Sequence, residues 1–221
     1  MSWKKKALEL AITTELSWRK IAKKLDKPKS TVSDFLREAI KQDRIYELNK
    51  EPKILHFDIE TSPLIVYSWN LWPKAIPVGN IIKDWEVLCW SAKWQGNPAI
   101  LNSSDCASEM YIVASLWTLL DGADVVVAYN GKSFDKKKMN AKFLEYGFPE
   151  PSPYKLVDPY LIVKGNFALT SKKMDFVVKY INDVEEGKHS TDFQLWVDCM
   201  NGVKGAQEYM QKYCDQDVLV H

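Results

Sequence analysis

Apolar residues recur at helical spacing in three consecutive segments at the start of the chain. The first covers residues 2–13, the second begins at Ser17, a favourable helix N-cap, and runs to Leu25, and the third follows Pro28. The apolar residues of the third segment are three and four positions apart, which places them on one helical face. They are Val32, Phe35, Leu36, Ala39 and Ile40. The residues expected on its outward face are Ser30, Thr31, Ser33, Asp34 and Arg37. The pattern predicts a small bundle of three helices.

A different pattern begins after residue 52. Residues 53–60 form a short apolar run that a Thr-Ser-Pro sequence closes, which is typical of a strand. With a side-chain period of two, Asp58 and Glu60 fall on one face of this strand, and Leu55, Phe57 and Ile59 fall on the other. The strand therefore separates a face with two carboxylates from an apolar face.

Strands and helices follow this first strand to the end of the chain. The expected order is two or three strands through Ile100, a helix at 108–120, a strand at 123–129, a helix at 133–146, a strand at 155–157, and helices thereafter. This order predicts an α/β fold with a mixed five-stranded sheet and flanking helices, preceded by a small all-α domain. We expect the all-α domain over residues 1–44, a linker over 45–52 and the α/β domain over 53–221.

Carboxylates are the candidate chemistry of the larger domain. Two carboxylates on one face of an apolar strand repel each other and lose hydration, and a divalent cation with oxygen ligands makes the arrangement favourable. Asp135 falls in the first turn of a predicted helix, after a turn at Asn130. Tyr213 and Asp217 share a helical face, whereas Asp215 points elsewhere and is expected to be solvated.

These residues resemble the motifs of a known superfamily. Phe57-Asp58-Ile59-Glu60-Thr61, Asn130-Gly131-x-x-Phe134-Asp135 and Tyr213-x-x-x-Asp217-Val218 are similar to the three motifs of the DnaQ-like 3′-to-5′ exonucleases, in the branch whose third motif contains a tyrosine (DEDDy). The resemblance runs from about Lys53 to Val220. Within the superfamily, the chain resembles a bacterial and phage group of predicted nucleases with an RNase H-like fold, in which a tryptophan-rich stretch follows the first motif.

The resemblance implies a two-metal nuclease. Asp58, Glu60, Asp135 and Asp217 would hold two Mg²⁺ or Mn²⁺ ions about 3.5–4 Å apart, one activating water and one stabilising the leaving 3′ oxygen. A tyrosine hydroxyl has an ordinary pKa of about 10, so Tyr213 would orient the attacking water rather than accept its proton. The implied reaction is hydrolysis of DNA from a 3′ end to nucleoside 5′-monophosphates. Without metal, raised carboxylate pKa values are expected.

Other residues near the motifs are candidates for supporting roles. Asn130 belongs to the second motif, and Asp158 resembles an extra aspartate of many family members, although a cap for a helix that begins at Pro159 is the alternative. Lys136, Lys137 and Lys138, with Lys142, form a basic stripe that could contact the substrate backbone, and a solvated helix face explains the stripe equally well.

The stretch from Ser17 to Arg37 resembles the helix-turn-helix of bacterial and phage DNA-binding proteins. The resemblance implies that the helix beginning near Lys29 enters the major groove of duplex DNA. Residues nearest the DNA would be Lys29, Ser30, Thr31, Ser33 and Arg37, with Lys20, Lys23, Lys24 and Lys27 beside phosphates. A helical interaction module is the alternative, because any small three-helix bundle needs similar apolar spacing.

Charge is divided unevenly between the two domains. The formal net charge is +1, but residues 1–50 hold 13 Lys and Arg against 7 Asp and Glu, and the remaining residues hold 17 against 22. A basic segment of this kind suits a polyanionic partner. Four scattered cysteines without a C-x-x-C pair, no long apolar run and no signal-peptide core are typical of a cytoplasmic protein that is neither secreted nor partnered with a membrane.

Several alternatives stay open at this point. The same metal site could serve an endonuclease directed by DNA sequence or structure, or an exoribonuclease, since nothing in the sequence reports contact with a 2′-hydroxyl. A non-catalytic DNA-binding regulator is a further alternative. Most tryptophans of residues 65–98 are expected to be buried, with Trp69 and Trp72 the most exposed. Because the chain ends at His221, we expect the helix that carries Asp217 to fray, either in a trimmed chain or until metal and nucleic acid order it.

Overall fold

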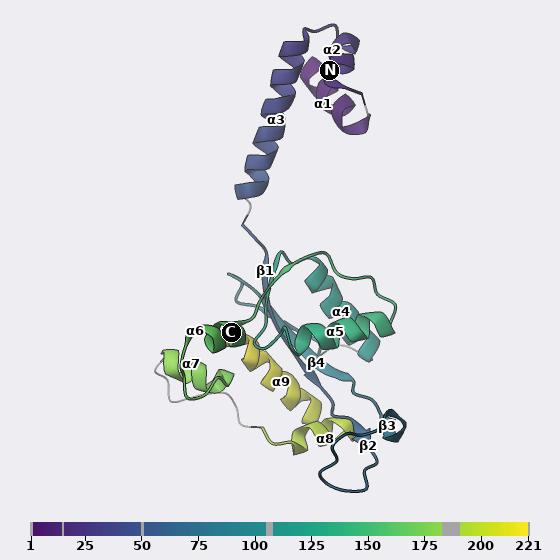
Figure 1. Ribbon diagram of the computed structural model, residues 1–221, viewed down its shortest axis with the longest axis vertical. Coiled ribbons are helices and arrows are strands. Elements are labelled where there is room, and N and C mark those ends of the chain that lie inside the picture. The colour runs from purple at the N-terminus through teal and green to yellow at the C-terminus, as the bar shows by residue number, and fades with distance from the viewer. Residues whose placement is uncertain (1, 15, 50, 105–107, 183–190, 221) are drawn as a thin grey trace. The chain divides into compact units, whose positions relative to one another are not determined.

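The computed structural model describes residues 2–14, 16–49, 51–104, 108–182 and 191–220 (Figure 1). The chain divides into two compact units, Met1–Glu51 and Pro52–His221. Among the described residues, no helix has both the length and the apolar character needed to cross a membrane.

The smaller unit is the expected bundle of three helices. They are α1 (Trp3–Thr13), α2 (Trp18–Lys24) and α3 (Lys29–Asn49). Their shared core consists of Ala7, Ile21, Ala22, Val32 and Leu36. The turn from α2 to α3 passes through Asp26 in a left-handed conformation (φ 51°), and the Lys27 N–H donates to the Ala22 carbonyl at 3.1 Å. Helix α3 includes residues 45–49, which were expected to belong to a linker.

The larger unit is built on a mixed five-stranded sheet, as predicted. Its strands, in spatial order, are β5 (Ile100–Asn102), β4 (Val87–Trp94), β1 (Ile54–Thr61), β6 (Val125–Val127) and β7 (Lys155–Val157). The central strand β1 pairs antiparallel with β4 and parallel with β6. Two short strands, β2 (Ile65–Val66) and β3 (Ile81–Lys83), form a separate ribbon, and a 3₁₀ turn, η1 (Val78–Asn80), precedes β3.

Helices cover both faces of this sheet. Helices α4 (Glu109–Asp121) and α5 (Asp135–Glu145) lie on one side of β1 and β4, and α9 (Ala206–Leu219) lies on the other (Figure 1). The remaining helices are α6 (Pro159–Asn166), α7 (Met174–Asn182) and α8 (Gln194–Met200). Together with the sheet order, these layers agree with an RNase H-like α/β fold.

The alternation predicted for β1 is confirmed. Leu55, Phe57 and Ile59 are buried in the main core together with residues of α4 and α5. The opposite face of β1 contacts α9, and it carries Asp58 and Glu60. Burial of one face thus fixes the register that presents both carboxylates to α9.

Candidate metal centre

Strand β1 supplies the first two carboxylates of the site. Asp58 is paired across the sheet with Ser91 of β4, and Glu60 is paired with Cys89. Both acids are half-buried, and the register of the ladder shifts directly after Glu60. Such bulges bend a strand and redirect its side chains, so this irregularity sets where Glu60 points.

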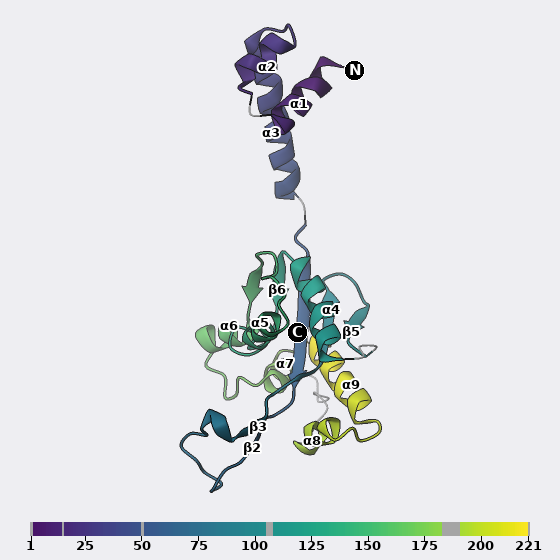
Figure 2. The same cartoon turned by 90° about the vertical axis from the view of Figure 1, so that its right-hand side faces the viewer.

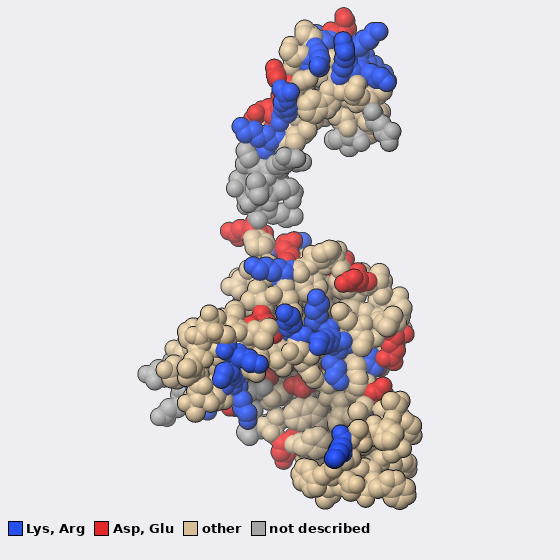
Figure 3. Space-filling view, viewed as in Figure 1, with Lys and Arg blue, Asp and Glu red and all other residues tan. Residues whose placement is uncertain are grey.

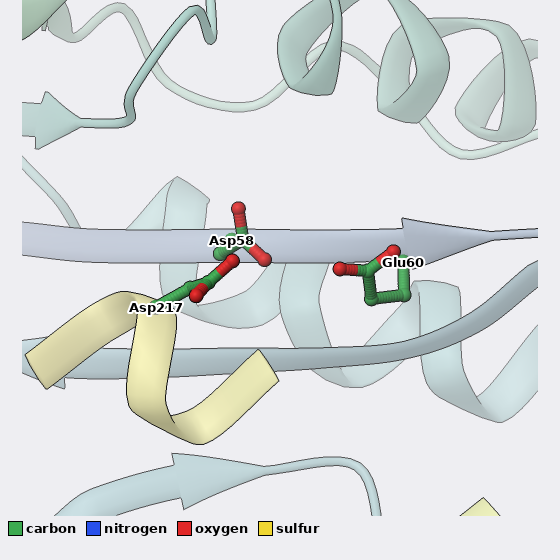
Figure 4. Close-up of side chains that lie close together, drawn as sticks. All are labelled: Asp58, Glu60 and Asp217. Carbon is green, nitrogen blue, oxygen red and sulfur yellow. The ribbon is translucent and has the colours of Figure 1, made fainter. Parts of the chain in front are cut away.

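Helix α9 brings in the third carboxylate. Asp217 is buried, with 3% of its surface exposed, and one carboxylate oxygen from each of Asp58, Glu60 and Asp217 lies within 4.8 Å of the other two. Figure 4 shows Asp217 reaching from α9 toward Asp58, with Glu60 further along the strand. Asp217 lies inside α9, which continues to Leu219, and Val218 beside it is buried.

A polar network holds α9 against the sheet. Asp215 accepts hydrogen bonds from Ser91 Oγ at 2.5 Å, from Gln211 Nε2 at 3.0 Å and from Asn102 Nδ2 at 3.2 Å. Gln211 also donates to the Trp90 carbonyl at 3.1 Å. The expectation of a solvated Asp215 was therefore wrong, since the polar side chains of β4 and β5 receive this face of the helix. No local sequence signal marks partners more than 100 positions away.

Asp135 lies next to this cluster, in the first turn of α5 as predicted. Its Oδ1 accepts a hydrogen bond from the Ile59 N–H at 3.3 Å, between the two acids of β1. Strand β6 pairs with β1 only as far as His56, so beyond the end of β6 the Asp135 carboxylate accepts the hydrogen bond of a β1 N–H group. Burial raises the pKa of Asp135 to about 7, and the charges of Asp158 and Asp217 add to the rise. A raised pKa is what was expected of a carboxylate in a metal-free site.

The turn before α5 is tightly specified. Asn130 has a left-handed backbone (φ 63°), and a Cβ on Gly131 would lie 2.4 Å from Ala128 Cβ. Asp158 accepts hydrogen bonds from the N–H groups of Asn130 at 2.9 Å and Lys132 at 3.1 Å. It also accepts from the Tyr160 N–H at 3.1 Å and so caps α6. The two roles considered for Asp158 are thus combined, because one carboxylate both caps a helix and holds the turn that leads to Asp135.

Tyr213 lies on α9 one turn before Asp217. It is half-buried, and its ring packs edge-to-face against Trp196 of α8 at 6.0 Å. His56 of β1 forms a hydrogen bond from Nε2 to Gln95 Oε1 at 2.7 Å.

Cys214 of α9 contacts Asp58, and the sequence did not indicate this contact. The Cys214 Sγ lies 3.5 Å from both the carbonyl oxygen and Oδ2 of Asp58. Burial raises the pKa of the Cys214 thiol, so the thiol remains protonated and can donate to Asp58. Cys89, Cys199 and Cys214 are free thiols, and Cys106 lies outside the described residues.

The lysines after Asp135 occupy different environments. Lys138 Nζ lies 3.6 Å above the Trp85 ring, Lys136 Nζ lies 5.6 Å from the Tyr154 ring, and Lys137 is exposed. Figure 3 shows basic side chains gathered on the face of the larger unit that carries α5. The next lysine of this helix, Lys142, is buried, and its Nζ lies 3.0 Å from a carboxylate oxygen of Glu109 and 2.9 Å from one of Glu145.

Most of the candidate DNA contacts in the smaller unit are exposed. They are Lys20, Lys23, Lys24, Lys27, Lys29, Ser30, Thr31 and Arg37. Ser33 was expected on the outward face of α3, and this was wrong, because only 7% of its surface is exposed. It follows Val32 and lies one turn before Leu36, two residues of the buried face of α3, so it lies at the margin of that face.

The donor set of the carboxylate cluster fits a hard divalent cation. Mg²⁺ and Mn²⁺ prefer oxygen ligands, and three carboxylates from two rigid elements converge here with a fourth, Asp135, beside them. Their mutual repulsion in a partly buried site is relieved when a cation binds. The cluster of Asp58, Glu60 and Asp217 is therefore able to hold a metal ion.

The larger unit combines an RNase H-like α/β fold with a cluster of carboxylates. Comparison with solved structures agrees with this fold. The chain is similar to the family B DNA polymerase from the hyperthermophilic archaeon Pyrobaculum calidifontis, with a TM-score of 0.56 and 16% sequence identity. The match covers 77% of this chain and 24% of the polymerase chain, so this chain spans about a quarter of the polymerase's length. Comparisons with protein-family profiles and with curated proteins find no match.

Proposed function

We propose that this protein is a nuclease that depends on two Mg²⁺ or Mn²⁺ ions and hydrolyses DNA from a 3′ end to nucleoside 5′-monophosphates. The observation that carries the proposal is the convergence of Asp58, Glu60 and Asp217 within 4.8 Å, beside the buried Asp135. The similarity in fold to a DNA polymerase supports DNA as the substrate.

Each catalytic group has a role that follows from its position. Asp58, Glu60, Asp135 and Asp217 hold the ions from a strand and two helices, which are more rigid supports than loops. When bound, the ions supply Lewis acidity that lowers the pKa of water and stabilises the leaving oxygen. Tyr213, one turn before Asp217, orients the attacking water with its hydroxyl.

The test uses a single-stranded oligonucleotide labelled at its 3′ end. The wild-type protein with Mg²⁺ or Mn²⁺ is expected to release a labelled mononucleotide, and Asp58→Ala or a chelator is expected to abolish the release. Activity that survives either treatment would contradict a role for the carboxylate cluster in metal-dependent hydrolysis.

An endonuclease on the same site is the second candidate. The observation that favours it is the separate basic unit with exposed lysines in α2 and α3, because a DNA-reading unit is of limited use to an enzyme that begins at any 3′ end. Cleavage of covalently closed circular DNA distinguishes the two, since a strict exonuclease leaves that substrate intact. The same panel with RNA separates a deoxyribonuclease from a ribonuclease, and binding without any cleavage would indicate a regulator.

A further inference from the structure

The ribbon of β2 and β3 ends in an aromatic loop, residues 67–80, that projects beyond the main sheet (Figure 2). The ribbon branches from the strand that carries Asp58 and Glu60. Its base is fixed by a hydrogen bond from the Ser62 N–H to the Glu86 carbonyl at 2.8 Å and by one from the Glu86 N–H to Ser62 Oγ at 2.9 Å. The loop is closed by a bond from the Tyr67 N–H to the Asn80 carbonyl at 2.9 Å. Hydrogen bonds therefore fix both ends of the aromatic loop, and the ribbon that carries it follows directly in sequence after the strand with Asp58 and Glu60.

Large apolar side chains are displayed on the aromatic loop rather than buried. Trp69 is 100% exposed and Trp72 is 91% exposed, whereas Trp90 in the sheet is 4% exposed. Leu71, Val78 and Tyr67 are exposed to a similar degree. Exposed apolar surface of this extent usually marks an interaction site. The expectation that Trp69 and Trp72 are the exposed tryptophans is thus confirmed.

The aromatic loop itself carries no acidic side chain that would repel a polyanion. No Asp or Glu occurs from Thr61 to Lys83, although the residues after position 50 as a whole contain more acids than bases. The loop itself contains Lys74. Figure 3 shows the end of the unit that carries β2 and β3 as largely uncharged. Aromatic faces combined with a lysine and no acid are typical of surfaces that bind single-stranded nucleic acid.

A hollow within the loop adds polar partners to the aromatic rings. Its volume is about 400 Å³, and its lining includes Tyr67, Ser68, Trp69, Asn70, Lys74 and Asn80. The volume falls within the range of pockets that take small organic groups. Ser68 Oγ donates to the Asn70 carbonyl at 2.6 Å and Asn80 Nδ2 donates to the Tyr67 carbonyl at 3.2 Å, so these two side chains hold the shape of the hollow. The Asn70 amide can bond to a base edge while a ring stacks on the base face.

We propose that the aromatic loop binds unpaired bases of the DNA strand whose 3′ end enters the carboxylate cluster. The inference rests on the proposed nuclease function and deepens it. Trp69 and Trp72 stack on bases, Lys74 contacts a phosphate, and the hollow accepts a base. Stacking on an aromatic ring tolerates every base, so the loop supplies affinity for single strands without sequence selection.

The test measures binding without cleavage. Anisotropy of a fluorescein-labelled single-stranded oligonucleotide is titrated with the full-length protein in chelator, and a duplex of the same length is titrated in parallel. Each of Trp69→Ala and Trp72→Ala is expected to weaken single-strand binding about tenfold, with a larger loss in the double variant and little change for the duplex. Trp69→Phe is expected to retain most of the affinity.

Matched controls separate the loop from unrelated effects. Tyr180 is an exposed aromatic on α7, and Tyr180→Ala is expected to bind like the wild type. The tryptophan variants should keep the wild-type melting temperature, because removal of fully exposed side chains leaves no cavity. Single-strand affinity within twofold of the wild type in the double variant would overturn the proposal. So would a double variant whose only changes are in self-association or in binding to lipid vesicles.

Failure of this inference is distinguishable from failure of the proposed function. A wild-type protein that binds single strands through the tryptophans but releases no mononucleotide contradicts the nuclease and leaves the loop supported. A protein that cleaves DNA and whose double variant binds as tightly as the wild type contradicts only the loop.

Discussion

Gly131 offers a steric test of the turn that positions Asp135. A Cβ at position 131 would lie 2.4 Å from Ala128 Cβ, far inside van der Waals contact, and 3.1 Å from the Ala128 carbonyl oxygen, a few tenths of an ångström inside it. Ala128 is fully buried, so it cannot move aside without displacing the core. Gly131→Ala is therefore expected to force the turn away from β6.

The magnitude follows from the cost of overpacking a close-packed interior. Such insertions cost about 1–3 kcal/mol, and for a chain of this length each kcal/mol lowers the melting temperature by about 2–4 °C. We therefore expect Gly131→Ala to melt about 2–12 °C below the wild type. Displacement of Asp135 is also expected to lower mononucleotide release by about tenfold or more, since misplacement by 1 Å can cost about a hundredfold.

Thermal unfolding followed by circular dichroism, together with the 3′-end assay, measures both effects. Gly165→Ala is the control, because nothing lies within 4 Å of a Cβ built there in α6. Ala128→Gly combined with Gly131→Ala removes the closest contact and should be more stable than the sum of the single effects. A Gly131→Ala protein as stable and active as Gly165→Ala would refute the steric argument.

Three further predictions concern the network and the acids. Asp215→Ala removes the shared acceptor of three donors and should lower the free energy of unfolding in urea by about 1–3 kcal/mol. Glu208→Ala, on the exposed side of α9, should change that free energy by less than about 0.5 kcal/mol, and equal effects of the two variants would argue against the network. In chelator, the folded protein keeps a proton on Asp135 up to a pH of about 7, whereas the unfolded chain releases that proton near pH 3.8, so the free energy of unfolding should fall as the pH rises between these values. Asp135→Asn should remove this decline in a melting series from pH 5 to 8. A decline that persists in the variant would show that other groups cause it. Adding Mg²⁺ or Mn²⁺ should raise the melting temperature of the wild type, by linkage of binding to folding, and should not raise that of Asp217→Asn; an equal rise in both proteins would place the ion elsewhere.

Local patterns in the sequence were sufficient where a single element decides the outcome. The period-two alternation of β1 predicts which residues face the core, and burial of Leu55 and Phe57 confirms it. The same alternation puts Asp58 and Glu60 on the face toward α9. The spacing of Asp217 along a helix predicts which side of α9 it occupies. These features depend on neighbours within a few positions, so the sequence carries them directly.

Features that depend on distant contacts could not be predicted. Asp215 accepts hydrogen bonds from Ser91 of β4 and Asn102 of β5, and the buried Lys142 forms an ion pair with Glu109 of α4 at 3.0 Å, beside a local pair with Glu145 of its own helix at 2.9 Å. The sequence interpretation placed both side chains at the surface, because charged residues are exposed on average. Their burial is stable only with partners that the fold brings from elsewhere in the chain.

The end of α3 shows that a polar sequence does not by itself predict a linker. Residues 41–53 are mostly polar, and residues 45–49 within them were expected outside the helix, but residues 41–51 contain neither Gly nor Pro. The next strong helix breaker after Pro28 is Pro52, and helical backbone continues to Asn49. Polar helix formers extend a helix until a breaker or a cap ends it.

Release of mononucleotides by a matched pair of α9 variants tests the central claim most directly. Asp217→Asn keeps the shape of a carboxylate in the cluster and removes its charge, while Glu208→Gln makes the same change on the exposed side of the same helix. With a 3′-labelled single strand and Mg²⁺ or Mn²⁺, we predict near-wild-type release by Glu208→Gln and almost none by Asp217→Asn, with both proteins folded. Equal release by the two variants, or none by the wild type with either metal, would contradict it.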